Sequence, residues 1–262
     1  MRVARPSLSR ERQRGFALVT VLWVGLILAA VVASLSATGR TEGRLARTHY
    51  DIARLDAAAA GAINVAILRM LGPASQAPPV DATPFAVEIG GQAVGVTVQD
   101  EAGKIDLNMA NGDLLKRLLI AAGAGPEDAR PLTENILQWR DGGAGQSPAP
   151  FKSVGELQLV PGMTPELFER IAPCLTVYSQ SPWVDPAAAP PDVLKALAAM
   201  GGPPPATVLA ARSAGSTDAA KIGHAFMITA EADGADGLRV AKTAVVRLTG
   251  SPLAPIAVYE WR

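Results

Sequence analysis

The side chains that most often carry catalysis are few in this sequence and stand far apart. The chain has two histidines, His49 and His224, and one cysteine, Cys174. No sequence motif gathers a serine or cysteine nucleophile with a base and an orienting acid. Cys174 lies between Pro173 and Leu175, a setting typical of a small buried apolar residue. The sequence therefore predicts that the protein is not an enzyme.

The region around Gly15 carries the clearest chemical signal. Five arginines precede it, and the 21 residues 16–36 carry no charge. A helix of that length spans about 31 Å, which matches the apolar core of a bilayer. A cleaved secretory signal is the alternative, but its apolar core is usually only about 7 to 15 residues long. Because basic flanks stay cytoplasmic, we expect residues 16–36 to span the inner membrane and the rest to be periplasmic.

Basic residues, then Gly15, then Phe16 at the start of an apolar helix resemble the cleavage junction of type IV prepilins. The resemblance implies cleavage between Gly15 and Phe16 by a prepilin peptidase and methylation of the Phe16 amine. The cut precedes the apolar segment, so the anchor stays in the mature chain. Loss of residues 1–15 leaves 19 basic and 23 acidic residues. No overall basic field then exists to bind nucleic acid by counterion release.

Thr20 departs from the usual pilin pattern. It is the fifth residue counted from Phe16, where most members of the superfamily carry Glu. That carboxylate is thought to pair with the N-terminal ammonium of a neighbouring subunit, because an unpaired buried charge is costly. A subunit with Thr20 offers no such partner, which favours a place at the tip of a filament. The alternative is a threonine whose hydroxyl bonds back to its own helix.

Residues 44–71 predict a second, amphipathic stretch of helix. Apolar residues recur there at steps of three, four and seven, and Gly72 and Pro73 then end the helix. The members of this apolar stripe are Leu45, Ile52, Leu55, Ala59, Ile63, Ala66, Ile67 and Met70.

Strand-like alternation on both sides of a helical stretch predicts an α+β protein. Residues 85–98 alternate around Gly90 and Gly91, as in a β-hairpin. Three further strand-like runs are 225–232, 238–248 and 256–261. Helical segments are expected at 113–122, 126–141, 153–159, 165–171, 190–200 and 204–212. We therefore expect a pilin-like long N-terminal helix packed on an antiparallel sheet, with a large helical domain inserted in that sheet.

The expected organisation has five parts. They are a cytoplasmic leader (1–15), a transmembrane helix (16–36), the first part of a pilin body (37–107), the inserted helical domain (108–214) and the second part of the body (215–262).

Several segments resemble the K-type minor pseudopilin of the type II, or general, secretion pathway. They are VQDEAGKIDLNMA (98–110), ILQWRDGG (136–143), the run 151–179, VDPAAAPPDVLKAL (184–197), AVVRLTG (244–250) and VYEWR (258–262). The resemblance implies a subunit that caps and primes the periplasmic pseudopilus. It also implies a tip complex with the I-type and J-type minor pseudopilins, and contacts with the major pseudopilin, the prepilin peptidase and the inner-membrane assembly platform.

Some members of this family bind calcium in the helical domain. In this chain Asp141 is followed by GGAGQSPAP, and the next carboxylate is Glu156. Calcium generally takes six to eight oxygen ligands, several of them carboxylates. Asp141 and Glu156 are thus the only candidate ligands from this stretch, and we expect no cofactor, with calcium as the alternative.

A DNA-uptake or type IV pilus role is the alternative function. The segment LQLVPGMTPELFERI (157–171) looks like a helix-hairpin-helix module, whose glycine turn offers N–H groups to phosphate. Such modules add Lys or Arg beside the turn, because phosphate contacts dominate affinity. Here Glu166 and Glu169 come before the first base, Arg170. The hairpin is therefore expected to serve packing.

Overall fold

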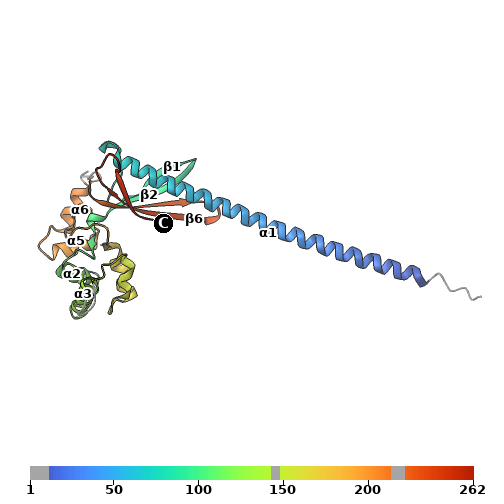
Figure 1. Cartoon of the computed structure of the whole chain (residues 1–262), viewed down its shortest axis with the longest axis horizontal. Coiled ribbons are helices and arrows are strands. Elements are labelled where there is room, and N and C mark those ends of the chain that lie inside the picture. Colours follow the sequence, from blue (N-terminus) through green and yellow to red (C-terminus); the bar gives the residue numbers. More distant parts are fainter. Residues whose placement is uncertain (1–11, 143–147, 214–221) are drawn as a thin grey trace, which may run out of the picture. The chain divides into compact units, whose positions relative to one another are not determined.

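The computed structural model describes residues 12–142, 148–213 and 222–262, and the chain divides into two compact units, Met1–Arg54 and Leu55–Arg262. In the first unit the described chain is the leading part of one long helix, α1 (Arg12–Leu71) (Figure 1). Large apolar side chains such as Leu18, Trp23 and Ile27 are exposed along it. Within the described residues, no helix combines the length and apolar character needed to cross a bilayer.

The second unit contains a five-stranded antiparallel sheet in the order β1-β2-β5-β6-β7. Its strands are β1 (Phe85–Ile89), β2 (Gln92–Asp100), β5 (Ala225–Asp233), β6 (Arg239–Leu248) and β7 (Ile256–Trp261). Gly90 and Gly91 close the first hairpin with positive φ angles of 57° and 77°, which glycine adopts without strain. The predicted strands and the α+β class are confirmed.

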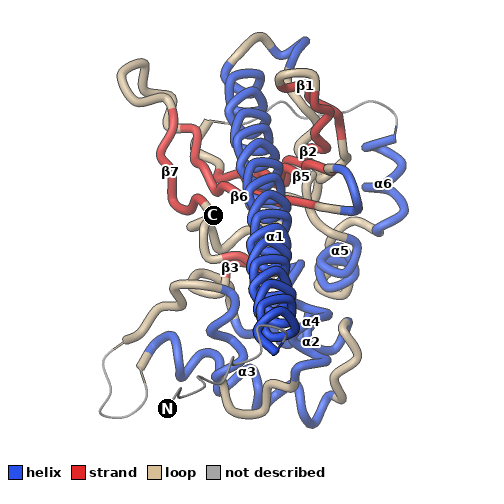
Figure 2. Tube along the Cα trace, turned by 90° about the vertical axis from the view of Figure 1, so that its right-hand side faces the viewer, coloured by secondary structure: helices blue, strands red, loops and turns tan. Residues whose placement is uncertain are grey.

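The last turns of α1 pack on one face of this sheet (Figure 2). Alternate residues of β2, Val94, Val96 and Val98, are fully buried against helix residues such as Ala59 and Ile63. Burial of each large side chain of this kind contributes about 1.5 to 3 kcal/mol. The small alanines on the helix let it approach the strands closely.

The predicted apolar stripe of α1 is correct only from Leu55 onward. Leu45 and Ile52 are 55% and 39% exposed, whereas Leu55 is 3% exposed. Periodicity gives the face of a helix but not how far along that face a partner extends. The sheet-packed part of α1 therefore begins later than the sequence pattern indicated.

A helical block lies between β2 and β5 in the sequence. Its elements are α2 (Gly112–Ala121), α3 (Pro126–Asp141), α4 (Pro165–Ile171), α5 (Pro191–Ala198) and α6 (Pro205–Ser213), with 3-10 turns η2 (Glu101–Gly103), η3 (Val154–Leu159) and η4 (Ala172–Cys174). The remaining 3-10 turns are η1 (Ala74–Gln76) and η5 (Ala235–Gly237). The block has its own core, built around Leu115, Leu118, Ile136 and Leu194. It is distinct from the core between α1 and the sheet.

Two details of this block go beyond the sequence prediction. The segment 153–159, predicted only as a short helix, is a 3-10 helix over Val154–Leu159. A two-residue parallel pair, β3 (Ile105–Asp106) and β4 (Leu175–Thr176), was also missed. Pairs this short carry no periodic signal, and their partners are distant in sequence.

Candidate functional site

The predicted processing site lies at the start of α1. Gly15 and Phe16 are within this helix, but their side chains, and residues 1–11 of the leader, lie outside the described residues. Thr20 is exposed on the first unit. Cleavage, methylation and the role of Thr20 therefore stay predictions.

The two candidate calcium ligands make other contacts. Asp141 ends α3, and its two oxygens lie 2.7 and 3.2 Å from the guanidinium nitrogens of Arg140. This hydrogen bonding lowers the pKa of Asp141. Glu156 Oε2 accepts a hydrogen bond of 2.9 Å from the backbone N of Lys152. No group of three or more His, Cys, Asp or Glu side chains suited to a metal occurs in the described part of the chain.

The hairpin between η3 and α4 is held by contacts within the block. Gly162 has a φ of 89°, which favours glycine. The Thr164 hydroxyl caps α4 by accepting from Leu167 N, and Asn135 Nδ2 donates to the carbonyl of Pro161 at 2.8 Å. The turn therefore docks on α3, in agreement with the packing interpretation.

A polar junction connects the end of β2 with the start of β5. Asp100 is the last residue of β2, and His224 precedes β5. Asp100 Oδ2 lies 2.8 Å from His224 Nδ1, and Oδ1 accepts from Ala102 N. Burial raises the pKa of Asp100, and the hydrogen bond from His224 opposes that rise. One buried carboxylate thus joins the two points where the chain leaves and re-enters the sheet.

Three further buried polar residues follow Asp100. Glu101 and Lys104 form an ion pair of 2.7 Å, with side chains only 1% and 9% exposed. Glu101 Oε2 is buried and has no hydrogen-bond partner within the described chain. Asp106 Oδ2 accepts from Ser179 Oγ and Gln180 N, so it fixes the loop after β4. The polar side chains of segment 98–110 therefore form a structural joint that holds the neighbouring backbone.

Arg247 on β6 ties the C-terminal strands to this joint. Its guanidinium donates to the carbonyls of Gly223 and Tyr178, both at 2.7 Å, and to Tyr259 Oη at 2.9 Å. Tyr178 Oη in turn donates to Glu260 at 2.6 Å. Burial and the Glu260 carboxylate raise the pKa of Tyr178 to about 12.

The sequence pattern indicates these segments but not which of their polar side chains pair. Asp100 and His224 are separated by 124 positions, so no local spacing relates them. The one usable signal was the density of charged residues in DEAGKID directly after an apolar strand. Charges at the end of a buried strand either reach solvent or find partners.

Comparison with known proteins finds similarity to a family model and to solved structures. Residues 96–180 match the family model described as type II secretion system (T2SS), protein K. The crystal structure of the GspK-GspI-GspJ complex from the type 2 secretion system of enterotoxigenic Escherichia coli contains a chain of similar fold. The TM-score is 0.55 at 14% identity, covering 82% of this chain and 98% of that one. No curated protein matches the chain.

Proposed function

We propose that this chain belongs to the protein K family of type II secretion systems. On that premise, it is a minor pseudopilin that caps and primes the pseudopilus. The match over residues 96–180 carries this proposal. That range runs from β2 through the polar junction to the loop after β4, and it contains α2, α3 and α4. The role is structural, in keeping with a polar joint whose side chains hold the backbone.

The partners proposed for this chain are based on the complex in which the solved relative was crystallised. That protein was crystallised as a GspK-GspI-GspJ complex, and the fold similarity extends over 98% of its chain. We therefore propose I-type and J-type minor pseudopilins as partners of this chain in a tip complex. Contacts with the major pseudopilin and the inner-membrane assembly platform belong to the same proposal.

Membrane anchoring and processing complete the proposal. The uncharged residues 16–36 would serve as the single span, with the second unit in the periplasm. Prepilin peptidase would cut between Gly15 and Phe16. Thr20 would leave a subunit above it without the carboxylate that its ammonium needs.

The size of the helical block would add to the effect of Thr20. The helical block between β2 and β5 enlarges the body beyond the sheet and its helix, which opposes placement within a packed shaft. Charge and bulk together support the position at the tip.

The test compares two glycine variants of α1. Gly15→Ala should leave an uncleaved membrane precursor and abolish secretion, because the peptidase cuts after this residue. Gly25→Ala is the matched control, since its added methyl group meets no atom within 4 Å. Immunoblots of whole cells and the mass of the extracted chain are the measurements. Normal processing of Gly15→Ala would refute the proposal.

Calcium binding remains a secondary proposal with a direct test. Asp141 and Glu156 would have to bind calcium together, and calorimetry with calcium on the wild type and Asp141→Asn checks this. The DNA-uptake role gains no support from the hairpin, where the backbone N of Met163 already donates to the carbonyl of Val160 at 3.1 Å. Salt-sensitive binding of duplex DNA at micromolar affinity would support the DNA-uptake role.

A further inference from the structure

The helical block and the sheet share little apolar surface. Their cores are separate, and within the described residues the buried apolar side chains that belong to neither core are Ala188, Ala225 and Val245. Two alanines and one valine contribute little apolar area to a contact between two bodies. Bodies of one chain that lack a large apolar boundary are expected to move relative to each other. The orientation of the block therefore depends on its polar contacts with the sheet.

The chain crosses between the two bodies at neighbouring strands. It enters the block after Asp100, at the end of β2, and returns to the sheet at Ala225, at the start of β5. The crossings are joined by the contact of 2.8 Å between Asp100 and His224. Beside the first crossing, Gln99 Nε2 donates to the carbonyl of Ala188 at 3.0 Å. Hinges are formed by a few residues at the ends of elements, and these two crossings have that form.

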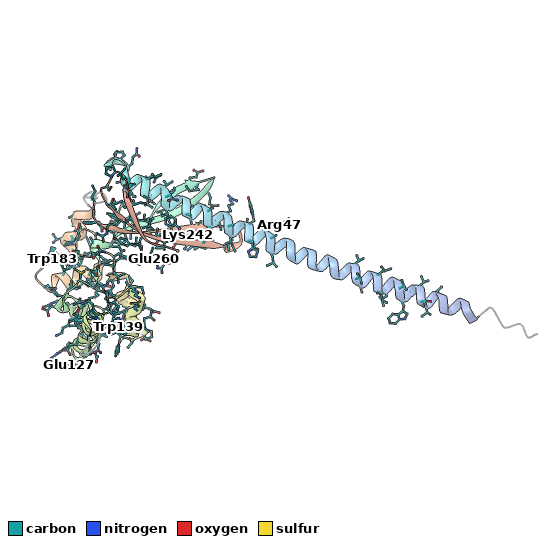
Figure 3. The ribbon with its side chains drawn as sticks, viewed as in Figure 1. Arg47, Glu127, Trp139, Trp183, Lys242 and Glu260 are labelled. Carbon is teal, nitrogen blue, oxygen red and sulfur yellow. The ribbon has the colours of Figure 1, made fainter. Side chains whose placement is uncertain are left out.

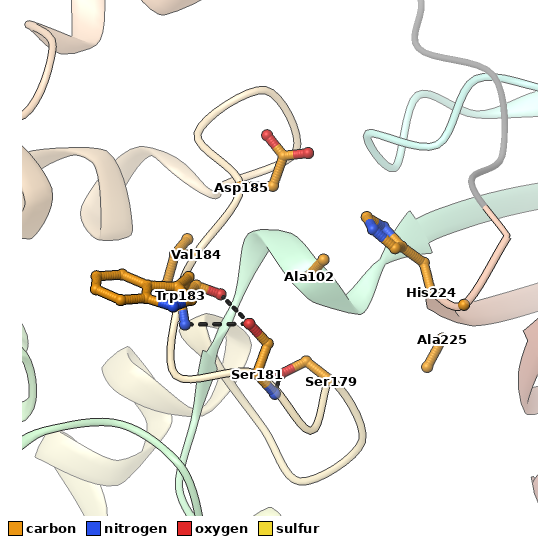
Figure 4. Close-up of a pocket in the computed structure, with 9 residues that line it drawn as sticks. Ala102, Ser179, Ser181, Trp183, Val184, Asp185, His224 and Ala225 are labelled. Atoms are coloured by element: carbon orange, nitrogen blue, oxygen red, sulfur yellow. Dashed lines mark hydrogen bonds between the residues drawn. The ribbon is translucent and has the colours of Figure 1, made fainter.

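Packing is open on this hinge side. A surface pocket of about 420 Å³ lies there. Figure 4 shows its lining, which comes from Ala102, His224 and Ala225 at the crossings and from residues of the loop 179–185 of the block. Closely packed interiors resist displacement because their side chains interdigitate. An open pocket beside the crossings leaves room for the block to turn about them.

A second set of contacts holds the block at β6 and β7. Arg247 on β6 donates to the carbonyl of Tyr178 at 2.7 Å, and Tyr178 Oη donates to Glu260 on β7 at 2.6 Å (Figure 3). The rings of Tyr178 and Tyr259 lie 6.1 Å apart. Because β7 is two strands away from β5, the contact with Glu260 acts about 10 Å from the hinge. Contacts far from a hinge oppose rotation more than contacts at the hinge do.

We propose that the helical block is a hinged body, and that Arg247, Tyr178 and Glu260 form a latch that fixes its orientation on the sheet. With the latch closed, the block takes one orientation. Without the latch, the block turns about the crossings at Asp100 and His224 while both cores stay intact. A closed latch favours any partner that binds this orientation, because less conformational freedom is lost on binding. The assignment does not depend on the partners named above.

The test measures distances between spin labels by double electron–electron resonance, on the full chain in detergent and in a Cys174→Ala background. One pair connects the sheet with the block, through Glu88→Cys on β1 and Glu127→Cys on α3, both exposed positions. A second pair lies within the block, through Glu127→Cys and Thr207→Cys on α6. With the latch intact, each pair should give a single narrow distance distribution.

The latch variant is Tyr178→Phe/Arg247→Met, which removes the hydroxyl and guanidinium donors and keeps the apolar size of both side chains. It should broaden and shift the distance between sheet and block, because the block then turns about its hinge. The distance within the block should stay narrow. The matched control is Tyr50→Phe/Arg239→Met, which makes the same two changes at exposed positions and should leave both distances unchanged.

Four results would overturn the assignment. A broad distance between sheet and block with the latch intact would mean that the latch does not hold the block. A narrow, unshifted distance in the latch variant would mean that other contacts fix the orientation. Equal broadening in the control would mean that the effect is not specific to the latch. Broadening within the block would mean that Tyr178 and Arg247 support the fold of the block and not its orientation.

Discussion

At the scale of single residues, the buried pair Glu101–Lys104 is the most sensitive contact of the joint. Lys104→Met should lower the free energy of unfolding by about 3 to 5 kcal/mol, because it leaves a buried carboxylate without its cation. The double variant Glu101→Leu/Lys104→Met should lose less than this, since neither charge remains. Urea denaturation of the three proteins measures the difference. Equal losses in the single and double variants would mean that the pair acts only through packing.

Cys174 gives a pH-dependent prediction. Burial, followed by the Asp192 carboxylate, raises the pKa of its thiol from about 9 to about 11. A raised thiol pKa means less thiolate below it, so alkylation at pH 8 should be about a hundredfold slower than at an ordinary thiol. The rate should still rise with pH above 9, where an ordinary thiol levels off.

Mass spectrometry after iodoacetamide treatment checks the reactivity of Cys174. The control is Cys174→Ala/Gln158→Cys, which moves the only thiol of the chain to an exposed position. Alkylation of native Cys174 at the rate of this control would show that the thiol is not buried.

At the scale of elements, β6 carries two arginines with different surroundings. Arg247 donates to three oxygens of three segments, while Arg239 is 61% exposed and pairs with exposed Asp233. Arg247→Met should cost about 1 to 3 kcal/mol of unfolding free energy, because two backbone carbonyls lose their donor. Arg239→Met is the control and should change little. Comparable losses for both would show that the three contacts do not act as a clamp.

The elements also show where prediction from sequence succeeds. The sheet strands follow from alternation, and α3 follows from its amphipathic pattern between Gly125 and Gly142. The polar joint does not follow, because Asp100–His224 and Tyr178–Glu260 pair residues 124 and 82 positions apart. Local periodicity reports a buried face but not which distant group meets it. The predicted apolar stripe was wrong at Leu45 and Ile52 for the same reason.

At the scale of the whole molecule, the register of β2 with β5 allows the helical block to be removed. Asp100 is opposite Phe226, so a two-residue Asn-Gly turn in place of residues 101–225 should close a regular hairpin. The sheet and the last turns of α1 should remain folded, because their core is separate from that of the block. Circular dichroism and urea denaturation check this.

The same deletion tests the tip proposal. Thr20→Glu alone should permit limited entry of this chain into the filament shaft, and Thr20→Glu combined with the deletion should permit more. The measurement is disulfide crosslinking to the major pseudopilin through a cysteine placed at Ala53, in a Cys174→Ala background. If the wild type crosslinks along the shaft as often as the combined variant, neither charge nor bulk confines the chain to the tip.

The separation of β2 from β5 also bears on how the chain folds as it leaves the ribosome. The β1–β2 hairpin is made early, but β5, the second neighbour of β2, is not synthesised until after the helical block. During that interval β2 is an open edge that carries Val94, Val96 and Val98, a hazard for aggregation. A block that folds first brings Asp100 and His224 together and shortens the effective loop that the sheet must close. If the helical block folds slowly, folding of the sheet should therefore depend on chaperones.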